Sequence, residues 1–297
     1  MAESEPFSPT PLRKELDAFY RRSGLTTRDG ADCPSYEGCR ASCLWEGEDG
    51  RKITPPTGAY VGRDYEAHRL LFVGINTNRG SDSSEAFYDS YHWISPAESD
   101  DSRIAGVIHR LTCMILGKPQ LRTEQSREYF AFTNLIKCSV NTQAGRPTRV
   151  MKDGCQIRHG FLFDEIDILK PRMIVAMGEA PYYAISDHYI QTVREVEGGI
   201  NGYMYQFQHE ARPVVAWFVY NPGARAPRTI WKEVRTSNTV SDGYRRFMPT
   251  GMSDRDLRAF LEKEYAAEQH VDAGNLFYQM MLHRLIDAAN SFVNRTI

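Results

Sequence analysis

Short apolar runs that end in turn residues recur along the chain and alternate with segments of helical spacing. The predicted strands are 70–76, 129–136, 172–178, 203–208 and 213–220. The predicted helices between them are 104–116, 161–170 and 181–190. The first three runs are almost free of charge, which is typical of parallel strands covered on both faces. This alternation predicts an α/β fold, a doubly wound α/β/α sandwich with a central, mostly parallel sheet.

The chain is predicted to have three parts. They are a helical arm and cluster-binding segment at 1–62, an α/β core at 63–235, and a helical extension at 236–297. Between the arm and the core the sequence is rich in cysteine, glycine and proline, which predicts an irregular segment. The extension carries two amphipathic helical patterns, and we expect it to pack on the same domain.

Asparagine side chains follow three of the predicted strands. Asn76 and Asn78 come after the first, Asn134 ends the second, and Asn221 follows the last. Ligands of such sheets bind outside the carboxyl ends of the strands. An amide offers both a donor and an acceptor, so it can read the edge of a base. Asparagine also ends strands for turn chemistry alone, but three at one rim favour a binding site.

The chain contains six cysteines but no apolar run long enough to span a membrane and no signal-like N-terminus. We therefore expect a cytoplasmic protein whose cysteines are ligands or core thiols and not disulfides. Cys113 lies in a helical apolar run and is predicted to be a core thiol. The other five are candidate ligands, and their spacing alone does not choose between zinc and iron–sulfur.

The formal net charge is −2, so the molecule as a whole is not a polycation. Binding to a nucleic acid would need a local basic face. Candidate basic clusters lie at 146–152, 225–235 and 245–246, although a solvated surface is the simpler interpretation of any one of them.

In the order of its motifs, the chain resembles the uracil-DNA glycosylase superfamily over roughly 33–235. FTNLIKC, Cys155 and LKPRMIVAMGEA resemble the iron–sulfur branch, called family four. VGIN at 73–76 instead resembles the mismatch-specific and single-strand-selective branches, and NPG at 221–223 resembles the mismatch-specific branch. The resemblance implies a monofunctional DNA glycosylase that binds DNA, lies off the membrane, acts as a monomer and releases a flipped-out pyrimidine.

The resemblance also implies roles for individual residues. Asn76 would position the attacking water, Asn221 would face the departing base, and Asn134 would hydrogen-bond its Watson–Crick edge. Tyr88 or its neighbour Phe87 would stack on the base. The loop predicted to contact DNA contains Pro222, Gly223, Arg225 and Arg228.

A [4Fe–4S] cluster is the cofactor that the resemblance favours, with zinc as the alternative. Cys138 and Cys155 match two of its ligands. The other two places have three candidates, Cys33, Cys39 and Cys43, none of which reproduces the Cys-x-x-Cys spacing of the family. Cys39 and Cys43 come nearest, because only three residues separate them, and we expect them to complete the set.

Three departures from the family bear on the substrate. Thr77, Asn78 and Asn221 stand where the family has Pro, a methyl-excluding Tyr and a His. A wider, more polar pocket would admit a larger pyrimidine, so the expected substrate is a modified base of phage DNA. The alternatives are ordinary uracil excision, an iron–sulfur nuclease or abasic-site lyase, and a non-catalytic binder of unusual DNA.

Overall fold

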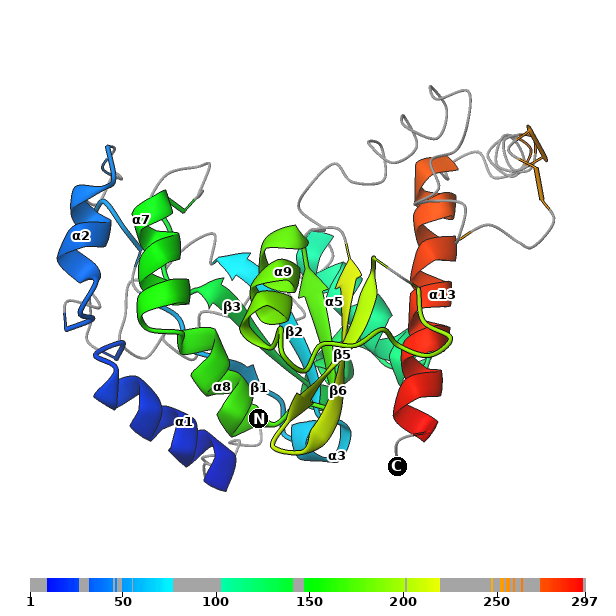
Figure 1. The fold of residues 1–297 in the computed structure, drawn as a ribbon, viewed down its shortest axis with the longest axis horizontal. Coiled ribbons are helices and arrows are strands. Elements are labelled where there is room, and N and C mark those ends of the chain that lie inside the picture. Colours follow the sequence, from blue (N-terminus) through cyan, green and yellow to red (C-terminus); the bar gives the residue numbers. More distant parts are fainter. Residues whose placement is uncertain are drawn as a thin grey trace, which may run out of the picture.

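A six-stranded mixed sheet forms the centre of the molecule, with helices packed on it in an α/β fold (Figure 1). The computed structural model describes residues 10–26, 32–44, 46, 50–54, 56–76, 103–140, 147–200, 202–219, 247, 252–253, 255–256, 259, 263 and 273–295. Among these residues no helix is both long and apolar enough to cross a membrane.

The strand order in the sheet is β1-β3-β2-β4-β6-β5. The strands are β1 (Tyr60–Val61), β2 (Leu70–Asn76), β3 (Phe130–Ile136), β4 (Met173–Met177), β5 (Met204–His209) and β6 (Arg212–Val219). The four central strands run parallel, whereas β1 and β5 pair antiparallel at the two edges. All five predicted strands are confirmed, and the mostly parallel sheet with them. The two-residue strand β1 was not predicted, because two residues carry no readable period.

Helices occupy the predicted connections. They are α1 (Pro11–Arg22), α2 (Tyr36–Ala41), α3 (Tyr65–His68), α5 (Arg103–Ile115), α6 (Thr123–Ser126), α7 (Arg149–Lys152), α8 (Phe161–Leu169), α9 (Glu179–His188) and α13 (Ala273–Arg295). A 3-10 turn, η2 (Arg127–Tyr129), leads into β3, and a π-helical turn, η3 (Asp153–Arg158), follows α7. The predicted helices of the arm and core are confirmed. Helix α13 corresponds to the second amphipathic pattern of the extension, and the first lies mostly outside the described residues.

Alternation along the strands divides the core between the two faces of the sheet. On β2, Leu71 and Val73 pack in one cluster with residues of α1, α8 and α9. Leu70 and Phe72, which point the other way, pack with residues of α5 and α13. Because successive side chains of a strand point to opposite faces, both sides of β2 are apolar. This double burial explains why its sequence is a continuous apolar run and not an alternating one.

Candidate functional site

The carboxyl ends of β2 and β3 hold two of the predicted asparagines side by side. In the parallel register Gly74 pairs with Asn134, and Asn76 pairs with Ile136 two residues further on. Asn134 thus pairs with the residue two positions before Asn76, and the two asparagines lie near each other at this end of the sheet. The structure thus brings together two of the side chains that the sequence assigned to the base site.

Asn134 is a buried polar group without a hydrogen-bonding partner for its side chain. It is 3% exposed, and no residue in the described part of the chain forms a hydrogen bond with its amide. A β-carbon at position 74 would lie 2.5 Å from Asn134 Oδ1 and 3.2 Å from Phe132 Cζ. Only glycine at 74 therefore leaves room for the Asn134 side chain in this orientation.

Asn76 is half-buried, and its amide is held in one orientation. Its Nδ2 donates to Ser139 Oγ at 2.8 Å. Ser139 is fully buried, and its backbone N–H donates to Thr54 Oγ1 at 2.8 Å. Since the nitrogen of the Asn76 amide is directed at Ser139, the position of its carbonyl oxygen is also set.

Asn76 and Asn134, at the carboxyl ends of β2 and β3, form what we call the asparagine rim. A buried ion pair lies directly beneath it. Lys137 Nζ donates to Glu165 Oε2 at 2.6 Å, to Thr133 Oγ1 at 2.8 Å and to the backbone carbonyl of Asn134 at 2.7 Å. Both charged side chains are fully buried. The three protons of the ammonium group thus all have acceptors, which a buried charge requires.

The same ion pair reaches the N-terminal arm. Tyr20 donates its hydroxyl proton to Glu165 Oε1 at 2.7 Å, and the backbone N–H of Ala59 donates to the Tyr20 oxygen at 2.6 Å. Thr133 donates to Glu165 Oε2 at 2.6 Å. The carboxylate therefore accepts on both oxygens and joins α1, β3 and α8 through one charge.

Four cysteines gather beside Lys137, contributed by three separate segments. Cys33, Cys39, Cys138 and Cys155 interact electrostatically in every pairing. Burial and then the neighbouring thiolates raise the pKa of Cys39 to about 12. The hydrogen bond between Cys138 and Cys155 lowers the pKa of Cys155 and raises that of Cys138. Mutual repulsion of this kind is relieved when a cation binds the thiolates.

Backbone donors surround the same sulfur atoms. The backbone groups of Ser35 and Tyr36 act to lower the pKa of Cys33, against the larger effect of burial, and the backbone group of Lys137 acts to lower that of Cys155. Hydrogen bonds to ligand sulfurs are a known means of tuning a bound cluster. Cys155 lies in the π-helical turn η3, a distortion found frequently at functional sites.

Cys43 lies apart from this group. Its sulfur donates to the backbone carbonyl of Cys39 at 3.4 Å, and its charge helps to raise the pKa of Cys39, but no other cysteine contributes to the raised pKa of Cys43 itself. The structure therefore places Cys33, and not Cys43, among the mutually interacting thiols. This difference from the expected set arises because a long-range turn, which spacing cannot reveal, brings residue 33 back to η3.

Thiolates are ligands of both zinc and iron–sulfur clusters, so the donor set is compatible with either. In the part of the chain that the structure describes, no three His, Cys, Asp or Glu side chains form a group that could hold one metal ion.

Several predicted site residues cannot be placed. The residues that lie outside the described part of the chain are Asn78, Phe87, Tyr88, Asn221, Pro222, Gly223, Arg225 and Arg228.

The sequence analysis missed Ser139, Tyr20 and Glu165. Glu165 carried a usable signal, because it lies among the buried positions of α8, where an acidic residue needs a buried partner. Tyr20 and Ser139 carried none, because both are polar residues of common type whose partners are distant in sequence.

No family model matches this chain, and a search of curated proteins also finds no match.

Proposed function

We propose that the protein is a monofunctional DNA glycosylase of the uracil-DNA glycosylase type, built on a doubly wound α/β/α core. It would bind DNA, extrude a pyrimidine and hydrolyse its N-glycosidic bond, leaving an abasic site. The observation that carries this proposal is the nearly buried side chain of Asn134, which lies against Gly74 at the same end of the sheet as Asn76.

Asn134 supports recognition of a base. The amide of Asn134 makes no hydrogen bond with a described residue, so its donor and acceptor atoms are available to a ligand. The Watson–Crick edge of a pyrimidine offers adjacent donors and acceptors that could pair with them. Gly74 contributes by leaving space for the amide, and any larger residue there would displace it.

Asn76 supports positioning of the nucleophile. In the proposed step a water oxygen bonds to the sugar C1′, while the electron pair of the glycosidic bond leaves with the base. A neutral amide is too weak a base to take the water's proton, which would pass to solvent or to the departing base. The contribution of Asn76 is therefore orientation through its carbonyl oxygen, whose direction is set by the bond to Ser139.

The contacts of Lys137 favour a hydrolase over a lyase. An abasic-site lyase needs an uncharged, accessible amine to form a Schiff base with the sugar. Lys137 is the lysine nearest Asn134 in sequence, but it is fully buried, and all three protons of its ammonium group are donated in hydrogen bonds. Its place is structural, as a counter-charge to Glu165.

Cys33, Cys39, Cys138 and Cys155 would hold the proposed [4Fe–4S] cluster, with zinc as the alternative. When bound, the cluster would supply a covalent link between the N-terminal segment, the end of β3 and η3. In the described part of the chain no cysteine forms a hydrogen bond with the side chain of Asn76 or Asn134, and the proposed role of the cluster is structural.

The preferred base is a modified pyrimidine of phage DNA, and plain uracil is the alternative. The sequence alone supports this part of the proposal, through Thr77, Asn78 and Asn221. Sparing the unmodified bases of the host would suit a defence against phages whose DNA is modified, and such an enzyme would act in the cytoplasm.

The test counts strand breaks after incubation with uracil-containing duplex and with hydroxymethylated or glucosylated phage DNA. A glycosylase yields breaks only after alkali, a nuclease or lyase yields them directly, and a binder yields none. Breaks without alkali, or none on any DNA, would refute the proposal. Asn134→Ala, which keeps the fold but removes the amide, should abolish the alkali-labile breaks.

A further inference from the structure

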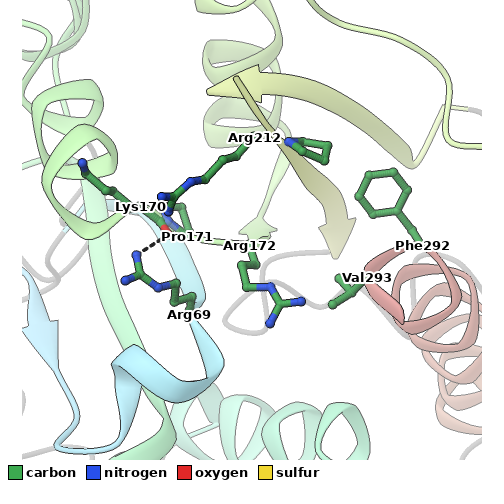
Figure 2. A pocket seen from close by; sticks show the side chains of 8 residues that line it. Arg69, Lys170, Pro171, Arg172, Arg212, Phe292 and Val293 are labelled. Atoms are coloured by element: carbon green, nitrogen blue, oxygen red, sulfur yellow. Dashed lines mark hydrogen bonds between the residues drawn. The ribbon is translucent and has the colours of Figure 1, made fainter. Parts of the chain in front are cut away.

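A second polar site lies at the amino-terminal ends of the parallel strands, opposite the asparagine rim. A pocket of about 240 Å³ is lined by Arg69, Lys170, Pro171, Arg172, Arg212, Pro213, Phe292 and Val293 (Figure 2). Arg69 directly precedes β2, Arg172 precedes β4, and Arg212 begins β6. Since β2 has seven residues, this basal pocket is about 20 Å from Asn76.

The lining of the basal pocket contains four cations and no acid. Arg172 makes no side-chain hydrogen bond or ion pair with any residue that the structure describes, and Arg69 donates to the backbone carbonyl of Lys170 at 3.1 Å. Lys170 pairs with Glu210 at 2.8 Å, and this hydrogen bond, with a smaller contribution from the charge of Arg212, lowers the pKa of Glu210. Glu210 lies outside the lining, on the exposed β5–β6 turn. Four like charges around one pocket repel each other, so a bound anion would stabilise it.

One wall of the basal pocket is apolar. Figure 2 shows Phe292 and Val293 of α13 on one side, facing the guanidinium groups of Arg69 and Arg212 across the space, with Arg172 between. Two prolines complete the lining. A ligand that fills this pocket would therefore carry an anionic group at one end and a small apolar or planar group at the other.

The backbone around the pocket supplies an independent observation. In the described part of the chain, four residues other than glycine have a left-handed backbone. Arg69 and Lys170, both with φ of 50°, end α3 and α8 and line the pocket. Glu210 and Ala211 form the two-residue turn directly before Arg212.

Glycine or asparagine is the usual residue at such helix ends, because other side chains are strained there. The chain instead keeps a long cationic side chain at both helix ends. Strained conformations of this kind gather at binding sites, where the side chain is needed. The backbone conformation at Arg69 and Lys170 therefore does not explain why cationic residues occupy these two positions.

We propose that the basal pocket binds a small phosphomonoester, with its phosphate among the three arginines and Lys170 and its organic group against Phe292. Arginine matches the paired oxygens of phosphate, and a doubly charged phosphate balances more of the cationic charge than a carboxylate does. The volume suits one phosphate with a small substituent and not a nucleic-acid strand. The site is separate from the asparagine rim, so the proposal does not depend on glycosylase activity.

The test is calorimetric titration of the full chain at low salt with inorganic phosphate, deoxycytidine 5′-monophosphate, unphosphorylated deoxycytidine and a DNA duplex. The two phosphate compounds should bind and deoxycytidine should not. Arg172→Gln and Arg212→Gln should each weaken binding about tenfold, as expected for a lost charged hydrogen bond. The matched control is Arg110→Gln, an exposed arginine of α5, which should bind as the parent does.

A second variant separates binding from folding. Lys170→Gly relieves the left-handed strain and removes only a solvent-exposed ion pair, so its melting temperature should be equal to or above that of the parent. Its phosphate affinity should nevertheless fall. Unchanged affinity in all three pocket variants would refute the proposal. Binding of DNA but not of the monophosphate, with DNA binding weakened by these substitutions, would also refute it, since the arginines would then contact a strand.

Discussion

The two ends of the same sheet treat charge in opposite ways. Beneath the asparagine rim, Lys137 and Glu165 are fully buried and their polar atoms are satisfied within the protein. At the basal pocket, Arg172 makes no ion pair in the described part of the chain, and the acid on which Arg212 acts, Glu210, lies outside the lining. A buried charge must be paired for the fold to form, whereas an accessible unpaired cation is free to bind a ligand. We therefore infer a structural role for Lys137 and Glu165 and a ligand-binding role for Arg172 and Arg212.

The largest effect is expected at the cysteines beside Lys137. Cys33→Ser should remove the cluster, since serine is a poor ligand for iron, and with it the brown colour near 400 nm that is typical of such clusters. Cys43→Ser is the matched control and should keep both colour and iron, because Cys43 interacts only with Cys39. Absorbance and iron analysis of the purified proteins check this. The reverse result would restore Cys43 as the ligand, and a colourless zinc-loaded parent would exclude the iron–sulfur cluster.

The next effect contrasts the two ion pairs. Glu165→Gln leaves the ammonium of Lys137 buried without a counter-charge and should lower the free energy of unfolding by about 3–5 kcal/mol. Glu210→Gln breaks the exposed pair with Lys170 and should leave stability unchanged within error. Urea denaturation measures both. Equal losses in the free energy of unfolding would show that burial does not set how much each ion pair contributes to stability.

A substitution at Asn76 tests the proposed catalytic role of the asparagine rim. Asn76→Ala should retain DNA binding but release base about 10²-fold more slowly, the magnitude expected when a group that positions the nucleophile is lost. Single-turnover release and gel-shift binding separate the two quantities. Arg172→Gln is the control at the other end of the sheet, and its release rate should match the parent. Turnover by Asn76→Ala at the parental rate would remove Asn76 from the mechanism.

The smallest effect concerns strain at the basal end. Ala211 has φ of 61° in the β5–β6 turn and does not line the pocket. Ala211→Gly should raise the free energy of unfolding by about 0.5–1 kcal/mol, because glycine adopts this conformation without a steric penalty. Phosphate affinity should not change. Destabilisation by this substitution would mean that the turn is not strained.

The asparagine rim was predictable in part, because strand ends can be read locally. The apolar runs located β2 and β3, and the sequence therefore placed Asn76 and Asn134 at the same edge. It did not predict that Gly74 would lie against Asn134, nor that Ser139 would orient Asn76, because both contacts depend on register and on loop paths. The parts of the predicted site at 78, 87–88 and 221–228 stay predictions.

Hydrophobic period is a local property of consecutive residues, so five of the six strands, the larger helices and the mostly parallel sheet could be read from the sequence alone. The packed molecule was needed to learn that Cys33 joins the other thiols, that Glu165 pairs with Lys137, and that a basic pocket exists. The pocket assembles residues around 69, 171, 212 and 292, and no window of sequence contains more than one of these positions. The physical reason is that burial is encoded residue by residue, whereas proximity arises only when the elements pack together.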